Sequence, residues 1–229
     1  MTKTNPSSDE VISRSGPDYA NVSRRKFLSF AGAASGLVAV AALSCKKSND
    51  DSSVSVGSGD TGVLNYAYAL EQLEAAFYIQ VVANSSFTSI FNADEQGLLT
   101  GIRDHEIAHR EFFKTALNTS AIAALEVDFS SINFGNRASV LGTAKAFEDL
   151  GVSAYNGAGN LITNGDYLVV AGKIVSVEAR HAAYIRDLIS NGSFADSTDA
   201  NGMDVAMAPR DVVAVANLYL KTKINANGL

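Results

Sequence analysis

Two copies of a Glu-x-x-His motif constrain this chain more than any other feature of its sequence. Glu106 and His109 lie in the segment GIRDHEIAHREFFK, and Glu178 and His181 lie in KIVSVEARHAAYIRDL. The chain has only three histidines, and two of them complete the motif. Residues three apart lie on one face of a helix, so each pair can bind a single metal ion. Apolar residues continue both faces at helical spacing, which predicts that the Glu and His side chains turn towards a core.

The composition favours long helices and an acidic surface. The 229 residues are 47% apolar and contain three prolines, none of them between Pro17 and Pro209. This predicts a helical chain with one main domain. From residue 46 onward there are 13 Lys and Arg against 21 Asp and Glu, a net charge of −8. Such a balance argues against nucleic acid as a partner.

Residues 1–45 predict an export signal that follows a polar, disordered start. Arg24 and Arg25 directly precede Phe27, Leu28 and an apolar run. At about fifteen residues the run is short for a membrane span and typical of a secretory leader. The paired arginines resemble the twin-arginine export signal.

Cys45 is the only cysteine, and it follows Ala42-Leu43-Ser44 in a sequence that resembles a bacterial lipobox. We expect lipid attachment at Cys45, with simple cleavage nearby as the alternative. The Ser- and Gly-rich residues 46–60 predict a flexible tether. The expected location is therefore the periplasmic side of the cell envelope, with the protein anchored to the membrane through its lipid.

Residues 61–229 predict an all-α domain, a four-helix bundle with an extra C-terminal helix. Helical periodicity covers residues 64–82, 92–118, 139–160, 166–190 and 209–223. Asn92 and Glu95 are expected to form a capping box, and Asn164-Gly165-Asp166 is expected to supply the turn and the N-cap of the fourth helix. Residues 119–138 lack a sustained period and predict a long crossover between the second and third helices.

The two halves of this domain repeat one pattern. In each half a Glu is followed by a Tyr seven residues later and then by Glu-x-x-His, as in Glu71, Tyr78, Glu106 and His109, and in Glu148, Tyr155, Glu178 and His181. A Glu from each of two helices, with a Glu-x-x-His from each of the other two, is the pattern of ferritin-like di-iron and di-manganese bundles. The segments LEQLEAAFY, HEIAH, FEDLGVSAY and VEARHAAYIR resemble the ferritin-like superfamily over about Gly62–Asn191. They are most similar to the exported bacterial ferritin-like domain proteins.

The resemblance implies a dinuclear site. It assigns Glu71 and Glu148 as terminal ligands, Glu106 and Glu178 as bridging ligands, His109 and His181 as ligands of one ion each, and Tyr78 and Tyr155 as neighbours of the site. Four carboxylates in a dry bundle would repel one another, whereas two divalent cations neutralise them. Oxygen and imidazole ligands suit iron or manganese, and zinc is also compatible.

Four residues near the motifs keep alternative interpretations. Glu74 is an alternative ligand to Glu71, but the shared Glu-to-Tyr spacing favours Glu71, and we expect Glu74 to support a ligand or face solvent. His105 precedes Glu106, and we expect it to point away from the metal-binding face. The two tyrosines are more typical of core aromatics that hydrogen-bond a buried carboxylate than of redox groups.

Two functions fit these predictions. The first is an exported oxidoreductase, ferroxidase-like or catalase-like, that oxidises Fe(II) or handles oxygen or peroxide at paired metal ions. The alternative is an envelope-anchored binding or stress-protection module whose metal site is structural or absent. Enzymatic activity stays open, and homo-oligomeric assembly is compatible with the sequence.

Overall fold

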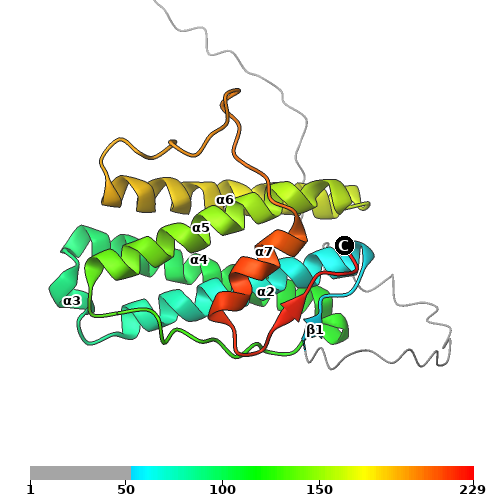
Figure 1. The fold of residues 1–229 in the computed structure, drawn as a ribbon, viewed down its shortest axis with the longest axis horizontal. Helices are drawn as coiled ribbons and strands as arrows, with labels where there is room; N and C mark the ends of the chain where they lie inside the picture. Colours follow the sequence, from blue (N-terminus) through cyan, green and yellow to red (C-terminus); the bar gives the residue numbers. More distant parts are fainter. Residues whose placement is uncertain (1–52) are drawn as a thin grey trace, which may run out of the picture. The chain divides into compact units, whose positions relative to one another are not determined.

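Four long helices form the bundle in the computed structural model, which describes residues 53–229 (Figure 1). They are α2 (Gly59–Ala83), α4 (Ala93–Leu117), α5 (Arg137–Ala158) and α6 (Gly165–Ile189), with α2 packed against α4 and α5 against α6. The prediction of an all-α bundle is confirmed. The expected leader, Cys45 and the first part of the tether lie outside the described residues.

Asparagine is the N-cap residue of three of these helices. Asn92 accepts a hydrogen bond from the backbone N–H of Glu95, and the Glu95 carboxylate accepts one from the N–H of Asn92, so the predicted capping box is present. Asn164 caps α6, as predicted, and Asn136 caps α5. One short helix, α3 (Phe87–Ile90), lies between α2 and α4.

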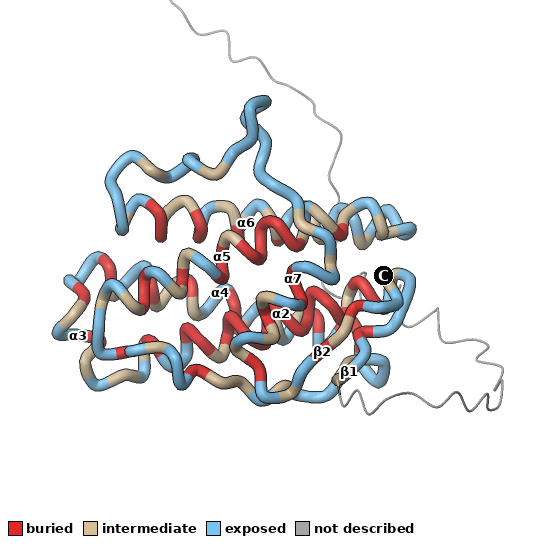
Figure 2. The backbone as a smooth tube through the Cα atoms, viewed as in Figure 1, coloured by how far each residue is buried: buried red, intermediate tan, exposed pale blue. Residues whose placement is uncertain are grey.

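Helix α2 is the central element, buried over most of its length (Figure 2). Phe77 on α2 packs edge-to-face against Phe147 on α5, with ring centroids 5.1 Å apart. The crossover after η2 (Asn118–Ser120) contributes Phe129 and Phe134 to the same cluster. A smaller cluster contains Tyr68, Phe113 and Ile174. The crossover is therefore part of the core, and it is fixed there by aromatic packing.

The segment that we expected to be a flexible tether is ordered from residue 53 onward. Strand β1 (Val54–Ser55) pairs in parallel with β2 (Ile224–Asn225), and the N–H of Val54 donates to the carbonyl of Lys223 at 2.7 Å. Because this pairing joins the two ends of the described chain, no local pattern could predict it. A Cβ on Gly228 would lie 2.3 Å from the carbonyl oxygen of Gly57, so this close approach requires glycine.

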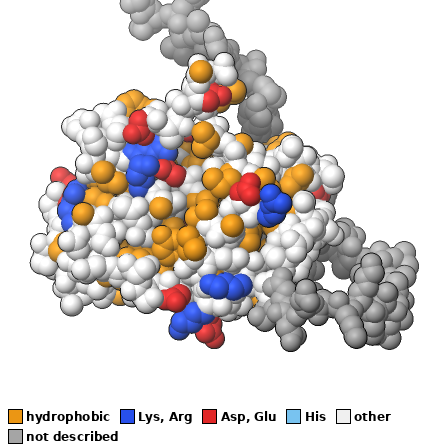
Figure 3. Space-filling view, in the orientation of Figure 1, with side chains coloured by type: hydrophobic (Ala, Val, Ile, Leu, Met, Phe, Trp, Pro, Cys, Tyr) orange, Lys and Arg blue, Asp and Glu red, His pale blue; other side chains and the backbone are white. Residues whose placement is uncertain are grey.

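The C-terminal helix is shorter than predicted. Helix α7 (Pro209–Ala216) continues only into η4 (Asn217–Tyr219), before the chain turns to form β2. Within residues 53–229 no helix combines the length and the apolar character needed to cross a membrane. Figure 3 shows one face of the molecule, where charged groups are scattered around exposed hydrophobic side chains.

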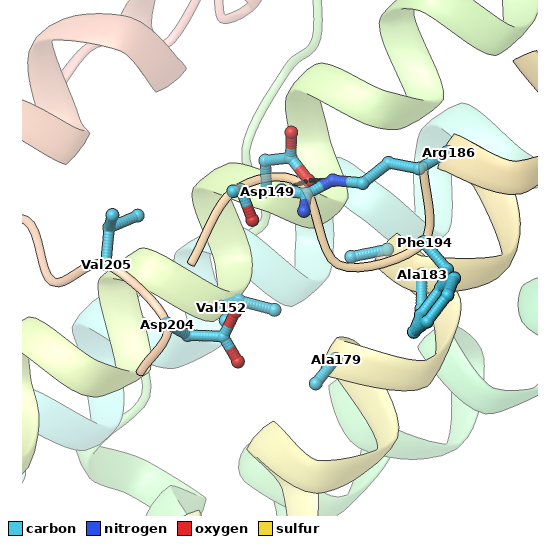
Figure 4. A pocket seen from close by; sticks show the side chains of 10 residues that line it. Asp149, Val152, Ala179, Ala183, Arg186, Phe194, Asp204 and Val205 are labelled. Atoms are coloured by element: carbon cyan, nitrogen blue, oxygen red, sulfur yellow. Dashed lines mark hydrogen bonds and ion pairs between the residues drawn. The ribbon is translucent and has the colours of Figure 1, made fainter. Parts of the chain in front are cut away.

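The loop between α6 and α7 is attached to the bundle by a buried arginine. The short helix η3 (Gly159–Leu161) joins α5 to α6. Arg186 on α6 contacts Asp149 on α5, with a distance of 2.6 Å between Nη2 and Oδ1. Arg186 and Asp149 are labelled in Figure 4. Asp196 in the loop lies 3.5 Å from the guanidinium group of Arg186. Further along, a Cβ on Gly157 would lie 1.9 Å from the carbonyl oxygen of Met207, so only glycine lets the loop approach α5 this closely.

Candidate metal centre

All six side chains singled out by the repeated motif meet between the four long helices. α2 contributes Glu71, α4 contributes Glu106 and His109, α5 contributes Glu148, and α6 contributes Glu178 and His181. They form two overlapping groups whose potential ligand atoms lie within 4.8 Å of one another, and Glu106 and Glu178 belong to both groups. Each of the two groups has the residue types and spacing that can hold a metal ion.

The first group surrounds His109. Its Nδ1 atom lies 2.8 Å from Oε1 of Glu178, 3.4 Å from Oε2 of Glu71 and 3.7 Å from Oε2 of Glu106. The shortest distance therefore runs from α4 to α6, and not to the glutamate on the histidine's own helix.

The second group surrounds His181 and repeats the first with the halves exchanged. Its Nδ1 atom lies 2.9 Å from Oε1 of Glu106, 3.4 Å from Oε2 of Glu148 and 3.5 Å from Oε2 of Glu178. Each histidine is thus closest to the Glu-x-x-His glutamate of the opposite half. The two groups are related by an approximate two-fold exchange of the helix pairs.

The polar atoms that face one another in this cluster are buried and lack hydrogen bonds. The four glutamates are 0% exposed, and His181 is 5% exposed. Within the described residues, ten buried side-chain N or O atoms have no hydrogen-bond partner, and eight belong to these six side chains: Oε2 of Glu71 and Glu148, both Oε atoms of Glu106 and Glu178, and Nδ1 of His109 and His181. The short N–O distances are therefore contacts without hydrogen-bond alignment. Unpartnered buried polar atoms are rare, so their concentration here marks a binding site.

The two tyrosines hold the remaining glutamate oxygens across the bundle. The Tyr78 hydroxyl on α2 donates to Oε1 of Glu148 on α5, and the Tyr155 hydroxyl on α5 donates to Oε1 of Glu71 on α2, both at 2.5 Å. Each terminal glutamate is left with only its Oε2 atom facing the cluster. This agrees with the expectation that each tyrosine hydrogen-bonds a buried carboxylate, and it shows that each partner lies in the other half.

Comparison with known protein families agrees with this geometry. A family model described as a ferritin-like domain matches residues 59–191, more than half of the chain. The chain belongs to the ferritin-like domain family. The matched residues contain α2, α4, α5 and α6 and therefore all six clustered side chains. A search of curated proteins finds no match.

Burial and mutual repulsion perturb the carboxylates of this ferritin-like domain. Burial and the charge of Glu178 raise the pKa of Glu71, and they raise the pKa of Glu106 to about 8. Burial raises the pKa of Glu148 to about 7. For Glu178 burial acts in the same direction, but the contacts with His109 and His181 outweigh it and lower its pKa to about 2. The carboxylates on α4 and α6 are thus unequal in the metal-free protein.

The neighbouring carboxylates raise the pKa values of both histidines and so favour their protonated forms. Burial lowers the pKa of His109, but Glu106, Glu178 and Glu71 outweigh it and raise the value to about 12. The pKa of His181 is raised to about 12 in the same way, with Glu106 as the largest contributor after the opposing effect of burial. In the metal-free ferritin-like domain, positively charged imidazolium groups partly balance the carboxylates.

Glu74 lies beside the cluster but belongs to neither group. It is 4% exposed and so does not face solvent, and burial together with the charge of Glu106 raises its pKa well above the usual value. A Cβ on Gly151 would lie 3.0 Å from Oε1 of Glu74. Gly151 follows Glu148 by three residues, as Glu74 follows Glu71. At equivalent positions of the repeat, one half therefore has the Glu74 carboxylate and the other half has a glycine that leaves room for it.

His105 also belongs to neither metal-binding group, but it contacts one of them from outside. Its Nδ1 atom lies 2.9 Å from Nε2 of His181. Burial and the neighbouring His181 and His109 lower the pKa of His105. Sequence reasoning did not find this contact, because a helical pattern places His105 off the Glu106–His109 face without showing what lies opposite. Nothing in the spacing of the motif indicated it.

The residues present suit a pair of divalent metal ions. Each group offers carboxylate oxygens and one imidazole nitrogen, a donor set that suits iron and manganese. The eight unpartnered atoms provide the donors without breaking any hydrogen bond in the described residues. The ferritin-like fold therefore contains a buried Glu/His cluster that can bind metal ions.

Proposed function

We propose that this ferritin-like domain binds two divalent ions, iron or manganese, and uses them to oxidise Fe(II) or to handle oxygen or peroxide. Glu71 and Glu148 would each bind one ion, Glu106 and Glu178 would bridge the ions, and His109 and His181 would bind one ion each. The observation that carries this proposal is the set of eight buried, unpartnered donor atoms on these six side chains.

Charge balance supports a pair of ions. With the histidines neutral, the four glutamates carry four negative charges, and two divalent cations neutralise them. Burying an unpaired carboxylate costs several kcal/mol, so an ionised cluster without a counter-charge would be strongly destabilising. In the absence of metal, protons on His109, His181 and Glu106 reduce the charge, which is what the raised pKa values of these residues express.

The bound ions would supply the electron transfer to oxygen or peroxide. The protein would hold the ligands in place and exclude water. Tyr78 and Tyr155 each occupy one oxygen of a terminal glutamate, so that Glu148 and Glu71 present a single oxygen to the cluster. The surrounding aromatic core keeps the site dry, which strengthens each electrostatic contact inside it.

Metal content and turnover together test this proposal. Full-length protein would be purified after growth with iron or manganese, its metal measured by elemental analysis, and its activity assayed with hydrogen peroxide and with Fe(II) under oxygen. We expect about two ions per chain and measurable turnover. Glu111→Gln changes an exposed glutamate on α4 and should leave both the metal content and the turnover unchanged. Bound metal without turnover would favour a structural metal site, and absence of bound metal would refute the proposal.

We also propose that the chain is exported and anchored through Cys45. The support is the sequence of residues 24–45, with paired arginines, an apolar run and a lone cysteine. Cell fractionation tests it: Cys45→Ser should move the protein from the membrane to the soluble fraction, and Arg24→Lys with Arg25→Lys should retain it inside the cell. An unchanged distribution in both variants would contradict the anchor and the export signal.

A further inference from the structure

One of the two histidines in the cluster is supported from outside, and the other is not. His105 on α4 and His181 on α6 are nearly coplanar, with ring planes 9° apart and centroids separated by 5.1 Å. Nε2 of His181 lies 2.9 Å from Nδ1 of His105, while Nδ1 of His181 lies 2.9 Å from Oε1 of Glu106. Nε2 of His181 thus has a partner outside the cluster, while Nδ1 faces the carboxylates inside it.

The repeat has no equivalent support for His109. Val177 precedes Glu178 as His105 precedes Glu106, and a valine side chain cannot form hydrogen bonds. Within residues 53–229, the polar contacts of His109 are made by Nδ1, with Glu71, Glu106 and Glu178. Its Nε2 atom makes no hydrogen bond there. The two groups that share the same ligand pattern thus differ in the outer contact of their histidine.

We propose that His105 is a positioning residue for one of the two metal positions, the one formed by Glu148 and His181, and that this position binds metal more tightly than the one formed by Glu71 and His109. The inference rests on the proposed dinuclear site. A histidine that binds metal through Nδ1 carries its proton on Nε2, and Nδ1 of His105 is placed to accept that hydrogen bond. Such a partner fixes the tautomer and the ring orientation and makes the ligand nitrogen more basic.

The surroundings of His105 allow the idea to be tested by substitution. His105 is exposed and borders a pocket of about 170 Å³, which is also lined by Gly97, Leu98, Gly101, Ile102, His181 and Tyr184. A leucine at this position removes the acceptor without overfilling a packed core. Asparagine keeps an acceptor near the place of Nδ1, because its amide oxygen is at a similar distance from the backbone. His105→Leu and His105→Asn therefore separate loss of the hydrogen bond from loss of the ring.

The experiment is a titration of metal-free, full-length protein with Mn(II), followed by electron paramagnetic resonance, which distinguishes free Mn(II), a single bound ion and a coupled pair. In the wild type we expect two steps of different affinity. Removing an outer hydrogen bond of a metal-binding histidine typically weakens metal binding about 10–100-fold. His105→Leu should weaken the tighter step by that factor and leave the weaker step unchanged. His105→Asn should restore most of the loss.

Val177→His is the reciprocal test, since it adds a histidine at the equivalent position of the other half. It should tighten the weaker step and leave the tighter step as it was, and Val177→Ala should change neither. If His105→Leu altered neither step or weakened both equally, or if His105→Asn failed to restore binding, the positioning role would be overturned. Should the wild type bind no pair of Mn(II) ions, the proposed function would fail as well. Two bound ions with no response to His105→Leu would refute the positioning role alone.

Discussion

The two helix pairs of the bundle carry the same chemistry in different surroundings. α2 with α4 and α5 with α6 each supply a glutamate, a tyrosine seven residues later and a Glu-x-x-His, and the distances around His109 and His181 are similar. Beside these residues the halves diverge: Glu74 corresponds to Gly151, and His105 to Val177. The donors that face the cluster repeat, whereas the residues that support them differ.

This divergence is complementary. Gly151 has no side chain where the carboxylate of Glu74 lies, so one half fills the space that the other leaves open. His105 likewise reaches from the first half to a histidine of the second. An approximately symmetric donor set is thus held by unequal supports, which would give the two proposed metal positions different properties.

The largest effect is expected from the glutamates that both groups share. Glu106→Gln should weaken the binding of both ions by about 100-fold or more, because Glu106 belongs to both groups and direct ligands matter more than their hydrogen-bonding partners. Glu71→Gln should remove only the ion next to His109. Elemental analysis after dialysis measures the remaining metal, with Glu111→Gln as the exposed control on α4. Equal losses in Glu106→Gln and Glu71→Gln would contradict shared carboxylates.

The next prediction concerns pH and the unequal carboxylates of α4 and α6. The raised pKa values of Glu106 (about 8), Glu148 (about 7), His109 and His181 (both about 12) mean that the folded, metal-free protein holds these protons more tightly than the unfolded chain. Their stabilising contribution is full at low pH. As pH rises, the contribution of each glutamate is lost between about 4.5 and its folded pKa, which is about 8 for Glu106 and about 7 for Glu148. The contribution of each histidine is lost between about 6.5 and its folded pKa of about 12.

Glu178 acts in the opposite direction, because its lowered pKa contributes stability that is lost only as pH falls from about 4.5 to about 2. The melting temperature of the metal-free protein should therefore fall as pH rises above neutrality. Bound metal should remove this decline, because metal binding near pH 7 displaces the protons held by His109, His181 and the glutamates with raised pKa values. Thermal unfolding with a chelator and with Mn(II), across pH, measures both curves. A metal-free melting temperature that rises in this range would contradict the protonated cluster.

A smaller effect is expected from the crossed tyrosines, and it should be equal in the two halves. Tyr78→Phe and Tyr155→Phe each remove a hydrogen bond to a buried carboxylate, which typically costs about 1.5–3 kcal/mol. Denaturant unfolding of the metal-loaded protein measures the loss. Tyr219→Phe is the control, because it keeps the ring contact with Phe147 and its hydroxyl has no hydrogen bond within the described residues. Clearly unequal losses would show that the exchange between the halves is not symmetric.

The smallest effect is expected where Glu74 meets Gly151. Gly151→Ala should destabilise the protein by about 1 kcal/mol or more, because the new methyl group would lie 3.0 Å from Oε1 of the buried Glu74 carboxylate. In a Glu74→Ala background the same change should become stabilising by up to about 1 kcal/mol, since alanine is the better helix former. Gly142→Ala, at an exposed site on α5 with open space, should stabilise either background. Without this change of sign, Glu74 and Gly151 are not coupled.

Much of the fold could be predicted from local sequence patterns. The helical spacing of apolar residues predicted the four long helices, and the pairs Asn92–Glu95 and Asn164–Asp166 predicted where α4 and α6 begin. These features depend on residues within one or two turns of each other, which is why they can be read from a single chain. The ordered segment at residues 53–60 was missed for the opposite reason, because its partner strand lies about 170 residues away.

For the candidate site, the sequence by itself determined which donors exist and that they repeat: Glu71, Glu106 and His109 in one half, and Glu148, Glu178 and His181 in the other. Only the tertiary structure decided their partners. Two hydrogen bonds join different helices, one between Tyr78 and Glu148 and one between His105 and His181. The close approach of Glu74 to Gly151 also joins two helices. Helical periodicity determines which face a residue occupies. The rotation and offset of packed helices, which depend on the whole core, determine what that face meets.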